Sequence, residues 1–370
     1  MNAYFAKKKP AIARELRRML ESRRAELGRI NGWGPDMVGR FINFCLKGKM
    51  IRGGLLLLGW EMHTRTSTVG VRAGAEPSPG PARPAPREVL QAAAAIEVLH
   101  SSLLIHDDIM DNDRLRRGDR TIFAQYEQAG RRAHASDPAA FGRSMGTCVG
   151  DAGYFLACEA LARLTIDAQR KASLIGLISR ELTYVAVAQM QDLAFAVSPR
   201  VPTREEVLAL YLYKTARYTF SLPLMAGALM AGAPALEQRR LSDLGERLGV
   251  IFQVRDDEMG IFGSEKQTGK PVGSDIREGK KTLLYLELLR KAKGTQRRTL
   301  AGLFGKSDLT PAESRRVGEA IEALGARRTM QELTEGLAAE ARGIIGSLPI
   351  PPEHVKILNE ICDGSLRRKR

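Results

Sequence analysis

The chain has 370 residues, of which 44 % are hydrophobic and 6 % aromatic, and its formal charge is +15. This length allows several domains but also one large helical domain with a sizeable core. The positive charge favours anionic partners, namely phosphorylated substrates, a membrane surface or nucleic acid. The basic residues are spread along the chain and match no nucleic-acid motif, so nucleic acid is the weakest of the three and is not predicted as a partner.

The sequence predicts a soluble cytoplasmic protein, with peripheral contact at most to a membrane. The N-terminus lacks the apolar segment of a signal peptide. The longest apolar run, Leu222 to Leu236, is too short to span a bilayer and is interpreted as a buried core helix. The four cysteines show neither pairing nor metal-ligand spacing and are interpreted as reduced core residues: Cys45, Cys148, Cys158 and Cys362.

The N-terminal part is predicted to consist of helices followed by a loop. Residues 2–30 are typical of an amphipathic helix, and a second helix leads into the sequence KGKMIRGGLLLLGW, which begins at Lys47. Lys49 and Arg52 lie three residues apart on one helical face, as two donors to one anion would. Residues 64–87 are rich in Pro, Gly, Ala and Arg without periodicity, which predicts a flexible surface loop without a catalytic role.

A helix over 88–112 is predicted to be central and buried, because it is apolar almost all round. Near its end, Asp107, Asp108 and Asp111 share one helical face, so three carboxylates point into the same space. Like charges this close repel one another unless a cation lies between them, and aspartate oxygens suit Mg²⁺. The alternative is a solvated, charge-rich helix end.

Basic residues follow this cluster. Arg116 and Arg117 supply forked donors that suit phosphate oxygens. Residues 129–141 are predicted to form a second loop. Further along, Lys214 and Thr215 end an apolar helical turn, and a lysine in that position needs an anionic partner.

A second carboxylate pair lies in the segment 249–282. An apolar helix ends in Asp256 and Asp257, and a Gly-rich stretch follows that carries Lys270, Asp275, Lys280 and Thr282. Two apolar helices that each end in an aspartate pair and are each followed by basic residues are difficult to explain as surface decoration.

The remaining pattern is helical. Thr203 and Thr310 each begin a capping box at the start of a helix. Further helices are predicted at about 326–347 and 351–362, followed by a basic tail at 364–370. No strand-period segment of useful length appears, so the sequence predicts an all-α fold.

The two aspartate motifs and the basic residues between them resemble those of the trans-type isoprenyl diphosphate synthases, the polyprenyl synthetase family, over about residues 45–285. The resemblance implies one domain over 1–370, built as a single large helical bundle around a central cavity, with the two Asp helices facing each other across it. It also implies a homodimer.

The resemblance implies a prenyltransferase that condenses isopentenyl diphosphate with allylic diphosphates, using three Mg²⁺ per active site for which Mn²⁺ can substitute. The implied metal ligands are Asp107, Asp108, Asp111, Asp256 and Asp257. The implied groups around the allylic diphosphate and its cation are Arg116, Lys214, Thr215, Gln253, Lys270 and Lys280. The residues implied to bind the diphosphate of isopentenyl diphosphate are Lys49, Arg52, His100 and Arg117.

The chain departs from the family pattern at three positions within these motifs. In the first basic motif, Lys47 replaces a glycine and Gly53 replaces a residue that is often proline. In the second aspartate motif, Gly260 stands where many members have a third aspartate. Glu258 cannot replace that aspartate, because a residue two positions after Asp256 points to the opposite side of the helix. Since the missing residue would add at most one ligand, we expect activity to survive.

Two other functions remain open. A class I terpene cyclase would also ionise an allylic diphosphate with Mg²⁺, but it would not need Lys49, Arg52 and Arg117. A non-catalytic subunit of a heteromeric synthase typically lacks the first aspartate cluster, which is intact here.

Product length is predicted from the residues that precede Asp107. Ser102, Leu103 and Leu99 offer no bulky floor to a growing chain, which favours geranylgeranyl diphosphate (C20), with C25 or longer as the next alternative and farnesyl diphosphate third. Tyr154 or Phe155 from a neighbouring helix would close the tunnel if either pointed into it.

Overall fold

The structure is a computed structural model that describes residues 3–64, 86–263 and 273–367. Most of the predicted loop at 64–87, the candidate residue Lys270 and the last three residues lie outside this part. The described chain is helical almost throughout, and the predicted all-α fold is confirmed. It divides into two compact units: Met1–Leu177 with Pro223–Pro234, and Ile178–Leu222 with Ala235–Arg370. The prediction of a single domain stays a prediction.

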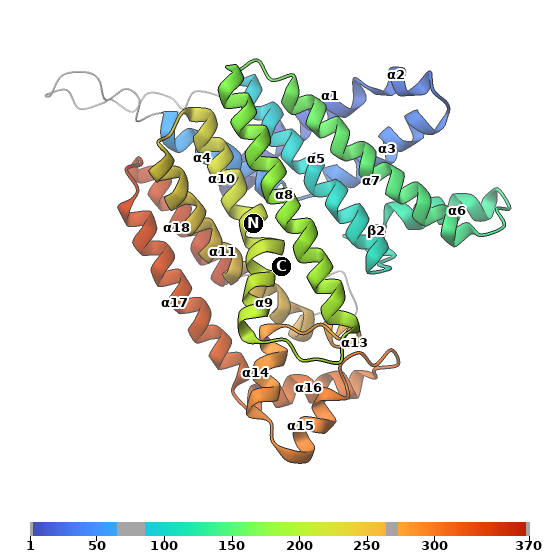
Figure 1. The fold of residues 1–370 in the computed structure, drawn as a ribbon, viewed down its shortest axis with the longest axis vertical. Helices are drawn as coiled ribbons and strands as arrows, with labels where there is room; N and C mark the ends of the chain where they lie inside the picture. Colours follow the sequence, from blue (N-terminus) through green and yellow to red (C-terminus); the bar gives the residue numbers. More distant parts are fainter. Residues whose placement is uncertain (1–2, 65–85, 264–272, 368–370) are drawn as a thin grey trace, which may run out of the picture. The chain divides into compact units, whose positions relative to one another are not determined.

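The first unit is organised around α5 (Figure 1). Its helices and strands are α1 (Ala3–Glu21), α2 (Arg24–Gly28), α3 (Trp33–Leu46), α4 (Ile51–Thr64), α5 (Arg87–Met110), β1 (Leu115–Arg116), β2 (Asp119–Arg120), α6 (Ile122–Arg132), α7 (Pro138–Ala162) and most of α10 (Leu222–Ala231). The chain passes into the second unit within α8 (Ala168–Val197).

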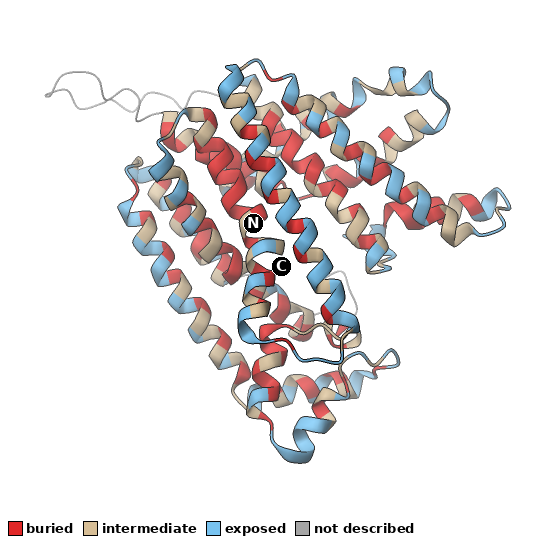
Figure 2. Ribbon diagram, in the orientation of Figure 1, coloured by how far each residue is buried: buried red, intermediate tan, exposed pale blue. Residues whose placement is uncertain are grey.

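Helix α5 is the buried centre of this unit, as predicted. It packs against α1, α3, α4, α6 and α7, and its alanine-rich middle is buried almost all round (Figure 2). Two glycines of α7 allow that helix to lie directly on α5. A Cβ atom at Gly150 would lie 2.3 Å from the His106 ring, and one at Gly153 would lie 2.2 Å from Ser102 Oγ.

The second unit is organised around α11, which packs against η2, α17 and α18. Its elements are α9 (Arg204–Leu210), η2 (Tyr211–Ser221), α11 (Ala235–Phe262), α13 (Ser274–Arg277), α14 (Leu283–Lys291), α15 (Gly294–Ala301), α16 (Pro311–Ala323), α17 (Ala326–Ser347) and α18 (Pro352–Leu366). Both predicted capping boxes are present, at Thr203 with Glu206 and at Thr310 with Glu313. The segment η2 is a π-helix, a rare form that is frequently found at functional sites.

Several predicted boundaries were wrong. The helix expected over 2–30 is interrupted after Glu21, so α1 and α2 are separate. The loop expected at 129–141 is much shorter, because α6 continues to Arg132 and Asp137 caps α7 by accepting a hydrogen bond from Ala140 N. The apolar run from Leu222 breaks at Gly232, whose φ of +83° ends α10.

Three further expectations need correction. The tail predicted from 364 begins later, because Ser365 is buried and α18 continues to Leu366. Cys148 and Cys158 are exposed on α7 and are not core residues. A short hairpin, β1 with β2, is present where no strand was predicted.

Among the described residues, α5 alone is long and apolar enough to span a membrane. Within the window that meets this test, 67 % of the residues are buried inside the protein, which is typical of the core helix of a globular fold.

Candidate active site

The first aspartate cluster lies at the C-terminal end of α5. Asp107 and Asp108 belong to its last turn, and Asp111 directly follows the helix. Carboxylates are unfavourable at this end, where the helix dipole is negative, so the cluster needs a cation. Arg116 provides one: its Nε donates to Asp108 Oδ1, and one of its terminal nitrogens lies 3.3 Å from Asp107 Oδ2. The same nitrogen lies 3.8 Å from Asp113 Oδ2, a carboxylate that the sequence analysis missed.

The hairpin of β1 and β2 determines where Arg116 and Arg117 lie. Arg116 pairs with Asp119 across the two strands, and the turn between them consists of Arg117 and Gly118, with φ angles of +55° and +82°. Two successive positive φ angles define the two-residue hairpin turn whose twist matches that of the strands. A residue with a side chain costs about 1–2 kcal/mol of conformational free energy at the first of these positions. An arginine held in this conformation suggests that its placement matters. The Arg-Gly dipeptide was the signal that could have predicted the turn.

Asp108 is the most deeply placed carboxylate of the first cluster, with 1 % of its surface exposed. Burial raises its pKa to about 7, against the opposing effect of Arg116. Its Oδ2 atom is buried and accepts no hydrogen bond within the described part of the chain. A buried, unsatisfied carboxylate oxygen beside other aspartates is a hard donor that suits Mg²⁺, so these residues fit the ion that the resemblance implies.

No group of three His, Cys, Asp or Glu side chains among the described residues is arranged to enclose a metal ion. In proteins Mg²⁺ usually keeps several waters and is bound by one or two carboxylates together with substrate phosphates.

A cationic cluster lies beside the aspartates in the same unit. The guanidinium of Arg117 lies against Gly48, since a Cβ atom at that glycine would be 3.2 Å from an Arg117 nitrogen. Burial lowers the pKa of Arg117, and neighbouring Arg116 and Arg52 lower it further. Burial together with the same three arginines holds the pKa of His100 well below its usual range. His100 and Arg117 therefore lie among positive charges that disfavour a further cation and favour an anion. Lys49 is exposed, two residues before α4.

The second aspartate pair lies near the end of α11, with its two members in different surroundings. Asp256 is exposed, whereas Asp257 is 6 % exposed. Asp257 Oδ1 accepts a hydrogen bond from Gln253 Nε2 at 2.8 Å, and its Oδ2 accepts one from the Tyr211 hydroxyl. Thr215 Oγ1 donates to Gln253 Oε1 at 2.7 Å. A polar chain therefore runs from η2 to the buried carboxylate, and Tyr211 is a member that sequence reasoning missed.

Two lysines of this unit already interact with carboxylates. Lys214 on η2 forms an ion pair with Asp192 on α8. Asp192 is therefore an anionic partner of the kind that the position of Lys214 required. Lys280 Nζ lies 3.0 Å from Glu278 and 3.6 Å from Asp275. Both amino groups are therefore positioned by acidic residues before any substrate is bound.

Asp275 occupies the space where the third aspartate of the second motif would lie. A Cβ atom at Gly260 would be 2.0 Å from Asp275 Oδ2. Burial, followed by the charge of Asp275, raises the pKa of Asp257 well above its usual range. Glu258 faces elsewhere, bonded to Arg255 at 2.5 Å and lying 3.9 Å from Arg327. Asp275 lies on α13, outside the motif, and the sequence analysis named it in the following stretch without giving it a role.

The predicted chain-length residues lie within the first unit. Ser102 is fully buried and faces Gly153 on α7, next to the Phe41 ring. Leu99 is buried and Leu103 is half-buried. Phe155 is 74 % exposed, so it does not close a tunnel from inside this unit.

The sequence profile described as Polyprenyl synthetase matches residues 39–323. The chain is 35 % identical over 237 residues to a short chain isoprenyl diphosphate synthase of Methanocaldococcus jannaschii, covering 64 % of this chain and 66 % of that protein. It is 34 % identical over 233 residues to a geranylgeranyl diphosphate synthase of Saccharolobus solfataricus, covering 62 % and 65 %. The chain thus spans slightly less than two thirds of these relatives.

Among solved structures, a geranylgeranyl pyrophosphate synthase of Corynebacterium glutamicum, crystallised with isoprenyl diphosphate and magnesium, superposes with a TM-score of 0.88. It is 27 % identical, and the superposition covers 98 % of this chain and 99 % of that one. The profile match extends over most of the chain and includes both aspartate clusters and the basic residues between them. The chain belongs to the polyprenyl synthetase family.

Proposed function

We propose that the protein is a Mg²⁺-dependent trans-prenyltransferase that condenses isopentenyl diphosphate with allylic diphosphates. The observation that carries the proposal is the pairing of acid and base in both units: Arg116 lies against Asp107 and Asp108, and Lys280 lies beside Asp275. Each group combines hard oxygen donors for a metal with cations for phosphate oxygens.

The first step is the departure of the allylic diphosphate. Asp107, Asp108 and Asp111, together with Asp256 and Asp257, would hold Mg²⁺, which when bound neutralises charge on the leaving diphosphate. We propose three ions per site, for which Mn²⁺ can substitute. Arg116, Lys214, Lys270 and Lys280 add hydrogen bonds to the same group, so that negative charge is stabilised as it develops.

The second step joins the two substrates. We propose that Lys49, Arg52, His100 and Arg117 hold isopentenyl diphosphate through its diphosphate. Its double bond attacks the allylic cation, a carbon–carbon bond forms, and a proton leaves to the released diphosphate. The neutral side chains Thr215 and Gln253 line the surroundings of the cation. Exclusion of water matters here, because water would otherwise capture the cation.

Asp275 joins the second metal site in this proposal. Its carboxylate lies at Gly260, where many members of the family carry an aspartate. The chain would therefore retain a third carboxylate in that region, contributed from α13 and not from α11.

We propose geranylgeranyl diphosphate as the product, with longer chains as the next alternative. The support is the absence of an aromatic side chain at 99, 102 and 103 and the similarity to relatives such as the geranylgeranyl diphosphate synthase of S. solfataricus. We also propose a cytoplasmic location, with no more than peripheral membrane contact.

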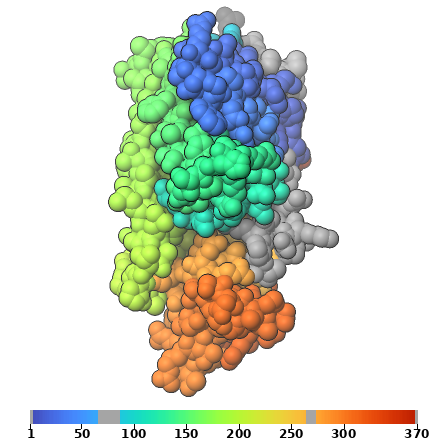
Figure 3. All heavy atoms as spheres, turned by 90° about the vertical axis from the view of Figure 1, so that its right-hand side faces the viewer, coloured from blue at the N-terminus to red at the C-terminus, as the bar shows by residue number. Residues whose placement is uncertain are grey.

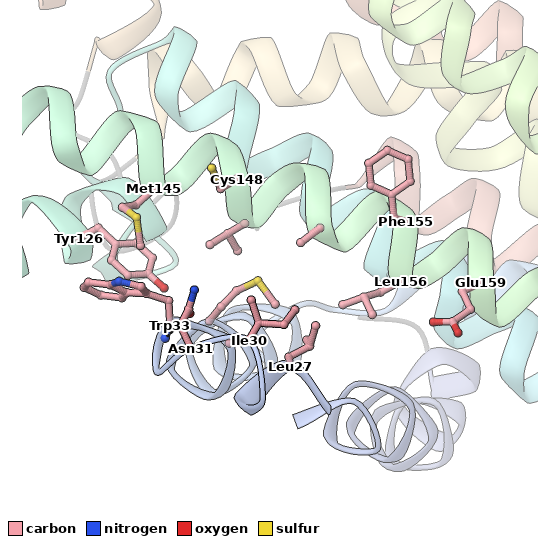
Figure 4. A pocket seen from close by; sticks show the side chains of 14 residues that line it. Leu27, Ile30, Asn31, Trp33, Tyr126, Met145, Cys148, Phe155, Leu156 and Glu159 are labelled. Carbon is pink, nitrogen blue, oxygen red and sulfur yellow. Dashed lines mark hydrogen bonds between the residues drawn. The ribbon is translucent and has the colours of Figure 1, made fainter. Parts of the chain in front are cut away.

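We further propose a homodimer, supported by an apolar pocket on the first unit. The pocket has a volume of about 510 Å³ and lies between α7 and the segment that joins α2 to α3 (Figure 4). Figure 3 shows the N-terminal helices (blue) and α6–α7 (green) as neighbours on one face. Phe155 and Ile30, both more than 70 % exposed, lie at this pocket. A face that carries both a projecting aromatic ring and an apolar hollow suits a two-fold interface, in which each copy presents the same patch.

The test is incubation with isopentenyl diphosphate, each allylic primer in turn and Mg²⁺, followed by dephosphorylation and chromatography. We expect linear prenyl alcohols. Cyclic hydrocarbons would indicate a terpene cyclase, and turnover only after addition of a second subunit would indicate a non-catalytic partner. Either result would overturn the proposal.

A further inference from the structure

Glu97 is a buried carboxylate on α5 with no role in the chemistry proposed above. Only 4 % of its surface is exposed. Its Oε1 atom accepts a hydrogen bond of 2.7 Å from the backbone N–H of Gly53, and the backbone N–H of Arg52 also bonds to the carboxylate. Because α4 begins at Ile51, these donors belong to its first turn, whose N–H groups have no partner within the helix. Glu97 therefore caps α4 from a different helix.

The contact between α4 and α5 has no room for a side chain at position 53. A Cβ atom at Gly53 would lie 2.9 Å from the carbonyl oxygen of Ala93 and 3.3 Å from Glu97 Cγ. Proline, which many relatives carry here, would also lack the N–H that donates to Glu97. Gly53, one of the positions where the chain departs from the family pattern, therefore leaves room for the contact and provides the N–H that donates to Glu97.

The capped turn carries one of the arginines of the cationic cluster. Arg52 follows Ile51 directly, and Arg52 and Arg117 both act on the Glu97 carboxyl, favouring its charged form against the effect of burial. Arg116 and Arg52 in turn lower the pKa of Arg117. Guanidinium groups this close repel one another, and an anion among them reduces that repulsion. Glu97 therefore holds the backbone of the turn and offsets the charge of its arginine.

We propose that Glu97 is a positioning residue for isopentenyl diphosphate, because its contact with the first turn of α4 fixes Arg52 in place beside Arg117. The inference rests on the proposed function, which assigns those arginines to this substrate. Glu97 acts through them and does not touch the diphosphate itself.

The experiment measures binding of isopentenyl diphosphate alone, by isothermal titration in EDTA, to wild type and Glu97→Gln. The amide retains the shape of the side chain but loses its charge and half of its acceptor capacity. We expect the dissociation constant to rise roughly 10-fold, the scale of a lost helix cap, while KM for the allylic diphosphate stays within about twofold. Glu88→Gln on the first turn of the same helix is the matched control and should bind like wild type.

Wild-type affinity in Glu97→Gln would overturn the proposal, and so would an equal loss for both substrates, which indicates a general structural role. If Glu97→Gln does not fold, Gly53→Ala tests the contact from the other side, because the added methyl group separates the two helices. Gly53→Ala should selectively weaken the binding of isopentenyl diphosphate, and an unchanged affinity for this substrate would again overturn the inference.

A further variant separates this inference from the proposed function. Arg117→Ala should raise the dissociation constant for isopentenyl diphosphate if the arginines hold this diphosphate. If Arg117→Ala binds normally, the assignment of the site fails. If Arg117→Ala loses binding while Glu97→Gln does not, the role of Glu97 alone is wrong.

Discussion

Gly260 and Asp275 share one space at the end of α11. A Cβ atom at position 260 would lie 2.0 Å from Asp275 Oδ2, so an aspartate there and the present position of Asp275 exclude each other. Lys280, 3.6 Å from the other oxygen of Asp275, holds that carboxylate in place. Asp275 therefore supplies a carboxylate where the motif lacks its third aspartate, at the second metal site that we propose.

The first prediction follows from this relationship. Asp275→Asn should weaken the apparent affinity for Mg²⁺ by roughly 10- to 100-fold, the range for removal of a supporting carboxylate. The measurement is a Mg²⁺ titration of turnover together with Mn²⁺ binding by electron paramagnetic resonance in the presence of diphosphate. Asp308→Asn, an exposed acid on the same unit, is the control. Equal metal affinity in wild type and Asp275→Asn would show that Asp275 only supports Lys280.

The second prediction concerns the first aspartate cluster. Asp107→Ala should lower kcat by roughly 10²-fold or more, because it removes a carboxylate that is proposed to hold the metal at the leaving diphosphate. Removal of Mg²⁺ with EDTA should stop wild-type turnover, and Mn²⁺ should restore it. Asp119→Ala, in the neighbouring hairpin, should change kcat little. Full turnover by Asp107→Ala in EDTA would contradict the metal role.

The third prediction separates the two diphosphates kinetically. Lys49→Ala and Arg117→Ala should raise KM for isopentenyl diphosphate, because both residues are proposed to donate to that substrate alone. Lys214→Ala should damage the allylic half-reaction instead, and it should also leave Asp192 without its ion-pair partner. Steady-state kinetics with each substrate varied in turn provides the measurement. If every constant for isopentenyl diphosphate were unchanged in Lys49→Ala, that residue would lose its assignment.

The structure also explains which parts of the site the sequence could indicate. Local spacing within a single helix indicated three features of the molecule: the aspartate pairs, the capping boxes at Thr203 and Thr310, and the buried character of α5. Tyr211 and Asp275 reach Asp257 and Gly260 through contacts between residues far apart in the chain. Local periodicity carries no information about such pairs.

A fourth prediction concerns pH and the ion pairs that Glu127 on α6 forms with Arg131 and with Arg114, which directly precedes the hairpin. Glu127 lies between Arg114 and Arg131, at 2.7 Å from each, and these two arginines lower its pKa to about 2. A depressed carboxyl pKa stabilises the folded state above the unfolded pKa, near 4.3, and this stabilisation is lost as pH falls toward 2. Glu127→Gln should therefore lower the free energy of unfolding by about 1 kcal/mol at pH 7 and by much less near pH 2. Urea titrations at both pH values test this. An equal loss at both would show that packing, and not charge, is responsible.

The last prediction concerns product length, where the structure changes the choice of variant. Ser102 is fully buried, and both its Oγ atom and the Phe41 ring lie against Gly153 on α7. Ser102→Phe must therefore displace α7 or Phe41 and should lower thermal stability. Leu103 is half-buried and lies four residues before Asp107, about 6 Å along the helix. One isoprene unit adds roughly 5 Å to the chain, so a phenylalanine at 103 would meet the product within its first units.

We therefore expect wild type to release C20 and Leu103→Phe to release mainly C15, with little change in the melting temperature. Leu103→Met, which changes shape but not volume, is the control and should retain the C20 product. The measurement is chromatography of the dephosphorylated products from equal turnovers. A wild type that stops at C15, or a Leu103→Phe variant whose products do not shorten, would show that the floor of the tunnel is formed by residues outside α5.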